Sequence, residues 1–298
     1  MDINFFIDYL RYERNYSVHT IVAYSNDLQQ FEGFLNSLGK QIDMKNADAD
    51  IVRKWIVYLM KQSYSSAAIN RKLSTLQSYF KFLIRQGVIK KNPIRLLTGP
   101  KKSKSLPYFI KEKDMNELLD EESKDEHFET IRNRLIMEIL YETGMRCSEL
   151  VGIKNADVDT ETMILKVTGK RNKQRLIPFA ELLKEKINQY NNVRAREAGK
   201  ENDYFFVRKD GRKITSAIVY YLVKKQLSTI STLSRRSPHI LRHTFATSML
   251  NDGAEISAVR NLLGHGSLAS TSIYTHVTFE ELKKIYNAHP RAQKIKEN

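Results

Sequence analysis

The stretch SPHILRHTFATSML, residues 237–250, places two histidines and an arginine within five positions, at His239, Arg242 and His243. A serine and a proline come directly before them, and this pair is typical of the N-cap and first position of a helix. The free N–H groups and dipole of a helix N-terminus favour anions, and a guanidinium fork strengthens phosphate binding. The stretch therefore indicates a phosphate site, with a metal site and a buried hydrogen-bond network as alternatives.

The metal alternative is weak. His239 and His243 have the spacing of a helical zinc motif, but the residues between them are Ile-Leu-Arg. A zinc motif of this kind carries a glutamate there, and a cation beside the metal ion would repel it. His239 and Arg242, three residues apart, are expected to share a helix face. His243 is interpreted as a structural residue of a buried network that supports the helix.

A second cluster, NLLGHGSLASTSIYTH, covers residues 261–276. Gly264 is typical of a helix C-cap, so His265 is expected on the turn that follows the helix. Tyr274 lies nine residues further on, in a short helical stretch rich in serine and threonine. Most tyrosines are core or surface residues, so Tyr274 taken alone does not indicate chemistry.

A third segment, ETGMRCSEL, covers residues 142–150. Gly144 is expected to end one helix, and Arg146 then opens the next. Glu149 follows three residues later, where a helix brings its carboxylate beside the guanidinium. A surface arginine is the simpler interpretation of Arg146 in isolation.

A β-hairpin is predicted by MILKVTGKRNKQRLIPF, residues 163–179, because two β-prone runs flank a polar turn. Lys170 lies at its tip. A tip lysine is usually solvated, but a short stiff hairpin also carries an amine into a site that other elements build.

The elements that must position these residues fall into two parts. Residues 1–97 predict a bundle of about four helices, with starts at Ser17, at about Asp48 and at Ser65 or Ser66. Arg71 and Lys72 are expected on its polar faces. Residues 107–298 predict a second domain, mostly helical, with one small sheet and a helix at 131–141. The fold class is thus mainly α.

The linker at residues 98–106 is marked by Pro100, a glycine and the lysines Lys101, Lys102 and Lys104, and Pro107 follows it directly. A lysine-rich linker between two basic domains fits a clamp that closes on a polyanion, although any solvated linker has a similar composition. With 49 Lys and Arg against 34 Asp and Glu, the net charge is +15 and the sequence pI is about 9.6. This excess favours nucleic acid as a partner over an anionic membrane surface.

Cys147 is the single cysteine, which excludes an intrachain disulfide and a cysteine-rich zinc site. The first residues are charged too early for a secretory signal, and no apolar run approaches the roughly 18 residues of a membrane span. These features predict a cytoplasmic protein.

Six of the singled-out residues, in their order along the chain, resemble the active site of the tyrosine recombinases, the phage-integrase family: Arg146, Lys170, His239, Arg242, His265 and Tyr274. Residues 1–97 also resemble the helical, SAM-like core-binding domain of that family, through the segment ERNYSVHTIVAYSNDLQQFEGFL. The ending YTHVTFEELKKIYNAHPRA is most similar to the Xer subgroup, whose members resolve chromosome dimers.

The resemblance implies a reaction and a role for each residue. Tyr274 attacks a DNA phosphodiester and forms a 3′-phosphotyrosyl link, so rejoining needs no metal ion, ATP or other cofactor. Arg146, Arg242 and His265 stabilise the charge on the phosphate oxygens. Lys170 is the general acid and His239 the base, although either histidine has suitable chemistry. Glu149 and His243 support these groups.

The resemblance also implies the partners. They are a double-stranded DNA target and a homo- or hetero-tetramer on two duplexes, the latter with a second Xer-like recombinase. Five basic residues are expected to contact DNA: Arg71, Lys72, Lys101, Lys102 and Lys104. A C-terminal segment, about residues 277–298, is expected to dock on a neighbouring subunit or to form a core helix of its own chain.

Three other functions stay open at this point. A mobile-element integrase, from a transposon or phage, belongs to the same family. A type IB topoisomerase-like relaxing enzyme shares the chemistry. A non-catalytic DNA-binding regulator would fit the helical content and the charge, but it would have no use for Lys170 or Tyr274.

Overall fold

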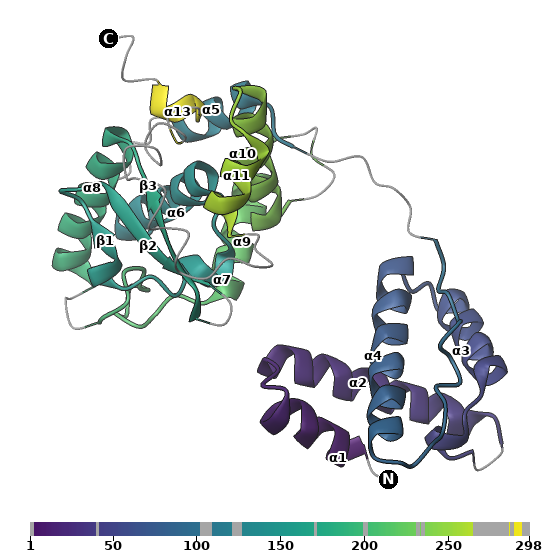
Figure 1. Cartoon of the computed structure of the whole chain (residues 1–298). Helices are drawn as coiled ribbons and strands as arrows, with labels where there is room; N and C mark the ends of the chain where they lie inside the picture. Colours follow the sequence, from purple (N-terminus) through teal and green to yellow (C-terminus); the bar gives the residue numbers. More distant parts are fainter. Residues whose placement is uncertain are drawn as a thin grey trace. The chain divides into compact units, whose positions relative to one another are not determined.

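The chain folds as two compact units, Met1–Leu106 and Pro107–Asn298 (Figure 1). The structure is a computed structural model, and it describes residues 3–39, 42–101, 109–120, 127–169, 172–198, 202–230, 233, 236–264, 286 and 289–293.

The first unit is a helical bundle, as the sequence predicts. Its helices are α1 (Ile3–Asp8), which continues into a π-helical turn at Tyr9–Glu13, α2 (Val18–Ser37), α3 (Ala49–Lys61) and α4 (Ser66–Arg85), with a 3-10 turn at Met44–Asn46. Side-chain caps begin three of them: Ser17, Asp48 and Ser65 accept hydrogen bonds from backbone N–H groups three residues ahead, at 3.3, 2.9 and 3.2 Å. The predicted starts are therefore confirmed.

Aromatic side chains fill the core of this unit. Trp55, the only tryptophan of the chain, is fully buried, and its ring centroid lies 4.8 Å from that of Phe31. Phe6, at 0% exposure, contacts Tyr79 and Phe82 with centroid separations of 5.4 and 5.3 Å. Ring pairs at these separations add to the stabilisation from burial, so α1, α2, α3 and α4 share one core.

One carboxylate is buried inside this unit. Asp27 on α2 is buried and accepts hydrogen bonds from Lys72 Nζ at 2.9 Å, from Thr75 Oγ1 at 2.9 Å and from Arg71 Nη1. The prediction that Lys72 lies on a polar face is wrong, because its ammonium is buried against this carboxylate. Arg71 does reach the surface, with 47% of its side chain exposed.

The second unit begins with α5 (Glu112–Asp120), α6 (Phe128–Thr143) and α7 (Cys147–Leu150). A short 3-10 turn (Asn155–Asp157) leads into strands β1 (Val158–Asp159), β2 (Ile164–Thr168) and β3 (Gln174–Pro178). The helices α8 (Glu181–Glu197), α9 (Ser216–Gln226), α10 (Pro238–Asn251), α11 (Ile256–Leu263) and α13 (Pro290–Gln293) complete it. Figure 1 shows α6 passing behind the sheet and α10 beside α11.

The sheet is antiparallel with the order β1-β2-β3. Leu165 pairs with Ile177 and Thr168 with Gln174, so the predicted hairpin is confirmed. The two-residue strand β1 was not expected. Leu165, Val167 and Ile177 face the core, in the alternation that a sheet with one buried face requires.

Helix α6 is the central helix of this unit and is buried along most of its length. It contains the predicted helix at 131–141 and ends at Gly144, whose φ of 57° is in the left-handed region. The predicted helix stop is thus confirmed. On α10, the side chains that face the core are Leu241, Phe245 and Met249, each at 0% exposure.

Cys147 lies at the start of α7 with its thiol buried, 3.9 Å from the carbonyl oxygen of Ser216. Burial raises the pKa of this thiol. None of the helices in the described part of the chain combines the length and the apolar composition of a membrane span.

The described C-terminal residues pack on α5 and α6 of their own unit. Tyr286 donates a hydrogen bond to Glu142 Oε2 at 2.8 Å, and the His289 ring stacks on Phe245 and Tyr286. Arg291 is fully buried, and it binds Glu138 on α6. Tyr286, His289 and Arg291, which belong to the predicted docking segment at 277–298, thus make contacts within their own unit.

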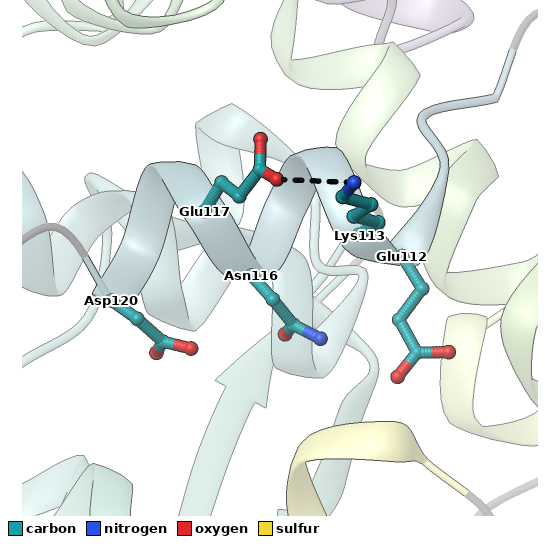
Figure 2. A pocket seen from close by; sticks show the side chains of 5 residues that line it. All are labelled: Glu112, Lys113, Asn116, Glu117 and Asp120. Atoms are coloured by element: carbon teal, nitrogen blue, oxygen red, sulfur yellow. Dashed lines mark ion pairs between the residues drawn. The ribbon is translucent and has the colours of Figure 1, made fainter.

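Arg291 also binds two residues of α5, through Nη1 to Asp120 Oδ1 at 2.9 Å and to Asn116 Oδ1 at 3.3 Å. Figure 2 shows Asn116 and Asp120 on the side of α5 toward α13, whereas Glu117 forms its ion pair with Lys113 on another side. The contacts to Arg291 therefore fix the C-terminal segment to one face of α5.

Candidate active site

Arg146 occupies the N-cap of α7, directly after the turn that ends α6. Its backbone N–H and its Nη1 both donate to the carboxylate of Glu149, each at 2.8 Å. The Glu149 carboxylate takes the N3 part of a capping box and also binds the guanidinium, so it fixes both the backbone and the side chain of Arg146. The sequence-based expectation that Glu149 holds this guanidinium is confirmed.

Arg175 on β3 contributes a second guanidinium to the same carboxylate, and it is not among the site residues predicted from the sequence. Its Nη1 and Nη2 donate to Glu149 Oε1 and Oε2 at 3.0 and 2.7 Å, in a bidentate pair. Its Nε donates to the carbonyl oxygen of Leu262 at 2.8 Å. The two-residue spacing of Arg175 and Ile177 was the available signal in the sequence, because it places both side chains on the same, core-facing side of the strand.

The electrostatics keep Glu149 ionised. Burial alone would raise the pKa of this carboxyl, but the hydrogen bonds and charge of Arg175, together with those of Arg146, outweigh the burial. The pKa of Glu149 therefore lies below its ordinary value.

Arg242 on α10 is buried, at 8% exposure, and joins the ends of two helices. Its Nη1 donates to the carbonyl oxygen of Gly144 at 2.6 Å, at the end of α6, and its Nη2 donates to that of Leu263 at 2.7 Å, at the end of α11. Burial, and next the positive charge of Arg146, lower its pKa to about 10. Arg242 therefore keeps its charge at neutral pH.

Two glycines allow the ends of α6 and α11 to lie close to their neighbours in the site. Gly144 and Gly264 both have positive φ, at 57° and 66°, and each ends a helix. A Cβ on Gly144 would lie 2.5 Å from Phe245 Cδ1 and 2.8 Å from Leu263 Cδ2, which is well inside van der Waals contact. The predicted C-cap at Gly264 is confirmed.

The two histidines of α10 differ from Arg242 in exposure. His239 and His243 are both exposed, while Arg242 points into the protein. The expectation that His243 is part of a buried network is therefore wrong. Ser237 does occupy the N-cap, but within the described part of the chain its hydroxyl makes no capping hydrogen bond.

Lys170, His265 and Tyr274 lie outside the described residues, but the residues before the first two are described. A Cβ on Gly169 would lie 3.1 Å from Glu149 Oε1, and one on Gly264 would lie 3.3 Å from Arg175 Nη1. The chain segments that lead to Lys170 and His265 thus contact the same cluster of charges.

We call Arg146, Glu149, Arg175 and Arg242 the arginine cluster. It holds three guanidinium groups and one carboxylate, for a formal charge of +2 at neutral pH. Of the other DNA-contact candidates, Lys101 is exposed, and Lys102 and Lys104 lie outside the described residues. A site with this excess of positive charge and forked donors is suited to a phosphate group.

Comparisons with known proteins agree with this chemistry. Residues 108–281 match the model of the phage integrase family, and residues 3–87 match its N-terminal SAM-like domain. A protein named tyrosine recombinase XerC from Staphylococcus carnosus is 39% identical over 292 residues, which cover 98% of each chain.

Solved structures share the fold. One is the XerH site-specific recombinase bound to a palindromic difH substrate in a post-cleavage complex, with a TM-score of 0.72, 22% identity, and coverage of 92% of this chain and 81% of that one. A lambda integrase tetramer bound to a Holliday junction has a TM-score of 0.68 at 18% identity, with coverage of 91% and 75%. Taken with the match over both units, these findings show that the chain belongs to the phage integrase family and is a tyrosine recombinase.

Proposed function

We propose that the chain is a site-specific DNA recombinase of the Xer type, with the arginine cluster as its phosphate site and Tyr274 as its nucleophile. The observation that carries the proposal is the position of Arg146 and Arg242. Both guanidinium groups are tied down by protein acceptors, and the carbonyls that hold Arg242 belong to backbone at two helix ends. Donors fixed in this way need no reorganisation when charge develops on a phosphate.

In the proposed reaction, the Tyr274 hydroxyl oxygen attacks the scissile phosphorus and its proton passes to His239. The bond from phosphorus to the 5′ oxygen breaks, and that oxygen takes a proton from Lys170. The tyrosyl–phosphate ester retains the energy of the broken bond, so the reverse attack by a 5′ hydroxyl reseals DNA without ATP. The exposure of His239 leaves its imidazole accessible to such a substrate.

The expected contribution of each donor is large. Removal of one donor to an oxyanion costs about 3 kcal/mol, or roughly 10²-fold in rate. Because Arg242 is buried and keeps its charge, solvent screens its interaction with a phosphate less than it would at the surface.

Charge supports double-stranded DNA as the partner. Residues 51–100 contain ten Lys and Arg and no Asp or Glu. We propose that Arg71, Lys101, Lys102 and Lys104 contact phosphates, whereas Lys72 neutralises Asp27 inside the bundle. Solved relatives that share the fold are bound to DNA, one of them as a tetramer. We propose the same assembly here, with the same or a second recombinase.

The biological role that we propose is the resolution of chromosome or plasmid dimers in the cytoplasm. The support is the similarity over 98% of the chain to a protein named XerC. In this proposal residues 1–97 bind the core DNA site and residues 107–298 carry the chemistry, in line with the two family models that match them.

The test uses a DNA site that the wild-type chain selects from a random-sequence library. A nicked duplex of that site traps the covalent product. Wild type should form a protein–DNA adduct that survives denaturation, with EDTA present and no ATP. The variant Tyr274→Phe should bind the duplex as wild type does and form no adduct. An adduct with Tyr274→Phe would remove this residue from its role.

Tyr221→Phe is the matched control, since Tyr221 is a strongly exposed tyrosine on α9, at 70% exposure. It should form the adduct at the wild-type rate. Loss of adduct in EDTA, with DNA binding intact, would contradict the metal-free reaction.

A further inference from the structure

We infer that Arg175 is a positioning residue of the recombination reaction, which holds Glu149 and the end of α11 so that the groups around the phosphate keep their places. The inference rests on the proposed function, since it assigns a task to Arg175 in that same site. Arg175 itself is buried at 5% exposure, so it acts through the residues that it binds.

The first contact of Arg175 joins β3 to α7. Arg175 forms a bidentate pair with Glu149, and Glu149 in turn accepts from both the backbone N–H and the Nη1 of Arg146. A carboxylate held by a rigid planar fork has little freedom to rotate or shift. The position of the Arg146 guanidinium therefore depends on Arg175.

A second contact of Arg175 joins β3 to α11. Arg175 Nε binds the carbonyl oxygen of Leu262, and Arg242 Nη2 binds that of the next residue, Leu263. Two guanidinium groups thus hold consecutive carbonyls at the end of the helix that precedes His265. Removal of one of them leaves a helix-end carbonyl without its donor.

Packing adds a third argument. A Cβ on Gly264 would lie within 3.3 to 3.5 Å of three atoms of the Arg175 side chain, and a Cβ on Gly169 would lie 3.8 Å from its Nη1. These glycines directly precede His265 and Lys170 in the sequence. Arg175 therefore supports the segments that lead to both of these residues.

The geometry requires arginine. Three N–H groups of Arg175 point along fixed directions to two different elements, at 2.7 to 3.0 Å. A lysine ammonium at this position would keep the charge but would not span both Glu149 oxygens and the Leu262 carbonyl in one plane. The variants Arg175→Lys and Arg175→Met thus separate the charge from the fork.

Because charged groups surround Glu149, the pH dependence of cleavage gives a readout that a loss of stability alone would not change. Arg146, Arg175 and Arg242 face this carboxylate, and Arg175 is the strongest influence that lowers its pKa against the effect of burial. Without Arg175, the buried carboxylate should take up a proton at a higher pH. A protonated Glu149 would hold Arg146 less firmly, so cleavage by the variant should fall as the pH falls.

The experiment measures single-turnover cleavage of the nicked duplex described above, from pH 5.5 to 8.5, by the full-length chain. We expect the DNA affinity of Arg175→Met to lie within about threefold of that of wild type. Its cleavage at pH 7.5 should be roughly 10²-fold slower, because a misplacement of about 1 Å in a catalytic site lowers the rate by about that factor. Its rate relative to wild type should fall further, at least tenfold, toward pH 5.5. Arg175→Lys should show a smaller loss at every pH.

Arg194→Met is the matched control. Arg194 on α8 is as buried as Arg175, at 6% exposure, and binds Asn155 Oδ1 at 2.6 Å and the Asn202 carbonyl at 2.9 Å. Its loss should lower stability without a pH-dependent loss of cleavage. In a Glu149→Gln background, the added effect of Arg175→Met should no longer depend on pH, because no carboxylate remains to titrate.

Three results would overturn the inference. They are a wild-type cleavage rate in Arg175→Met, a rate ratio that is constant with pH, and an equal pH-dependent loss in Arg194→Met. If Arg175→Met is too unstable to assay, Arg175→Lys tests the need for the fork, and a wild-type cleavage rate in that variant at every pH would overturn the inference. Failure of wild type itself to form an adduct would instead contradict the proposed function, so the two failures are distinguishable.

Discussion

The substitution Gly144→Ala tests how tightly the end of α6 is built into the active site. Gly144 has a φ of 57°, where an alanine costs about 1 kcal/mol. Its new Cβ would lie 2.5 Å from Phe245 Cδ1 and 2.8 Å from Leu263 Cδ2. An ordinary contact begins at 3.4 Å, so the aromatic ring or the backbone must move by 0.9 Å, the difference between 3.4 and 2.5 Å.

Overpacking of this kind adds about 1–3 kcal/mol to the backbone cost. We therefore expect Gly144→Ala to lower the free energy of unfolding of the second unit by about 2–4 kcal/mol. The same displacement moves the carbonyl that holds Arg242 Nη1, so single-turnover cleavage should fall by roughly 10–10²-fold.

Gly253→Ala is the control that isolates the backbone cost. Gly253 has a φ of 86° in the same unit, and a Cβ there would meet nothing within 4 Å. It should cost only about 1 kcal/mol and leave cleavage unchanged. Urea unfolding, followed by amide hydrogen exchange on peptides of α6 and α10, measures both variants, and Trp55 fluorescence reports the first unit. Equal losses of stability in the two variants would refute the packing argument.

Three further predictions concern single buried groups. In urea unfolding, Arg242→Lys should lose about 1.5–3 kcal/mol of stability, because one ammonium does not span the carbonyls of Gly144 and Leu263. The rate of DNA cleavage should fall at least about 10²-fold. A near-normal cleavage rate would show that the guanidinium fork is not needed. Burial, aided by the charge of Arg291, lowers the pKa of His289 to about 3. The unfolded chain therefore takes up a proton on this imidazole below about pH 6.5, and the folded chain does not. From pH 7.5 to 5.5, the free energy of unfolding of wild type should fall by about 1.4 kcal/mol more than that of His289→Phe. A difference between the two that does not change with pH would contradict this. Asp27→Asn should cost the first unit about 3–5 kcal/mol in a urea titration read by Trp55 fluorescence, because it leaves the Lys72 ammonium buried without its partner; the double variant with Lys72→Met should recover most of this loss.

Local signals carried the correct predictions of secondary structure. The caps at Ser17 and Ser65 bind N–H groups within the same helix turn, so nothing distant is needed to identify them. The stop at Gly144 follows from the left-handed φ that glycine tolerates. The contact between Arg146 and Glu149 spans three residues, which helix geometry alone places side by side.

The wrong or missing predictions involve partners far away in sequence. Lys72 has the composition of a surface residue, and its burial depends on Asp27, 45 residues earlier. Arg175 is an ordinary basic residue of a hairpin until Glu149 and Leu262 come together around it. The exposure of His243 also depends on which face of α10 the rest of the unit covers.

The buried thiol of Cys147 has a practical consequence for measurements on this chain. Maleimides and spin labels react with an exposed thiolate, and both the burial and the raised pKa of this thiol oppose that reaction. Because the native chain has no other cysteine, a label placed at a new surface cysteine should be site-selective with Cys147 left in place. Distances between labelled subunits on DNA can then be measured on an otherwise unaltered protein.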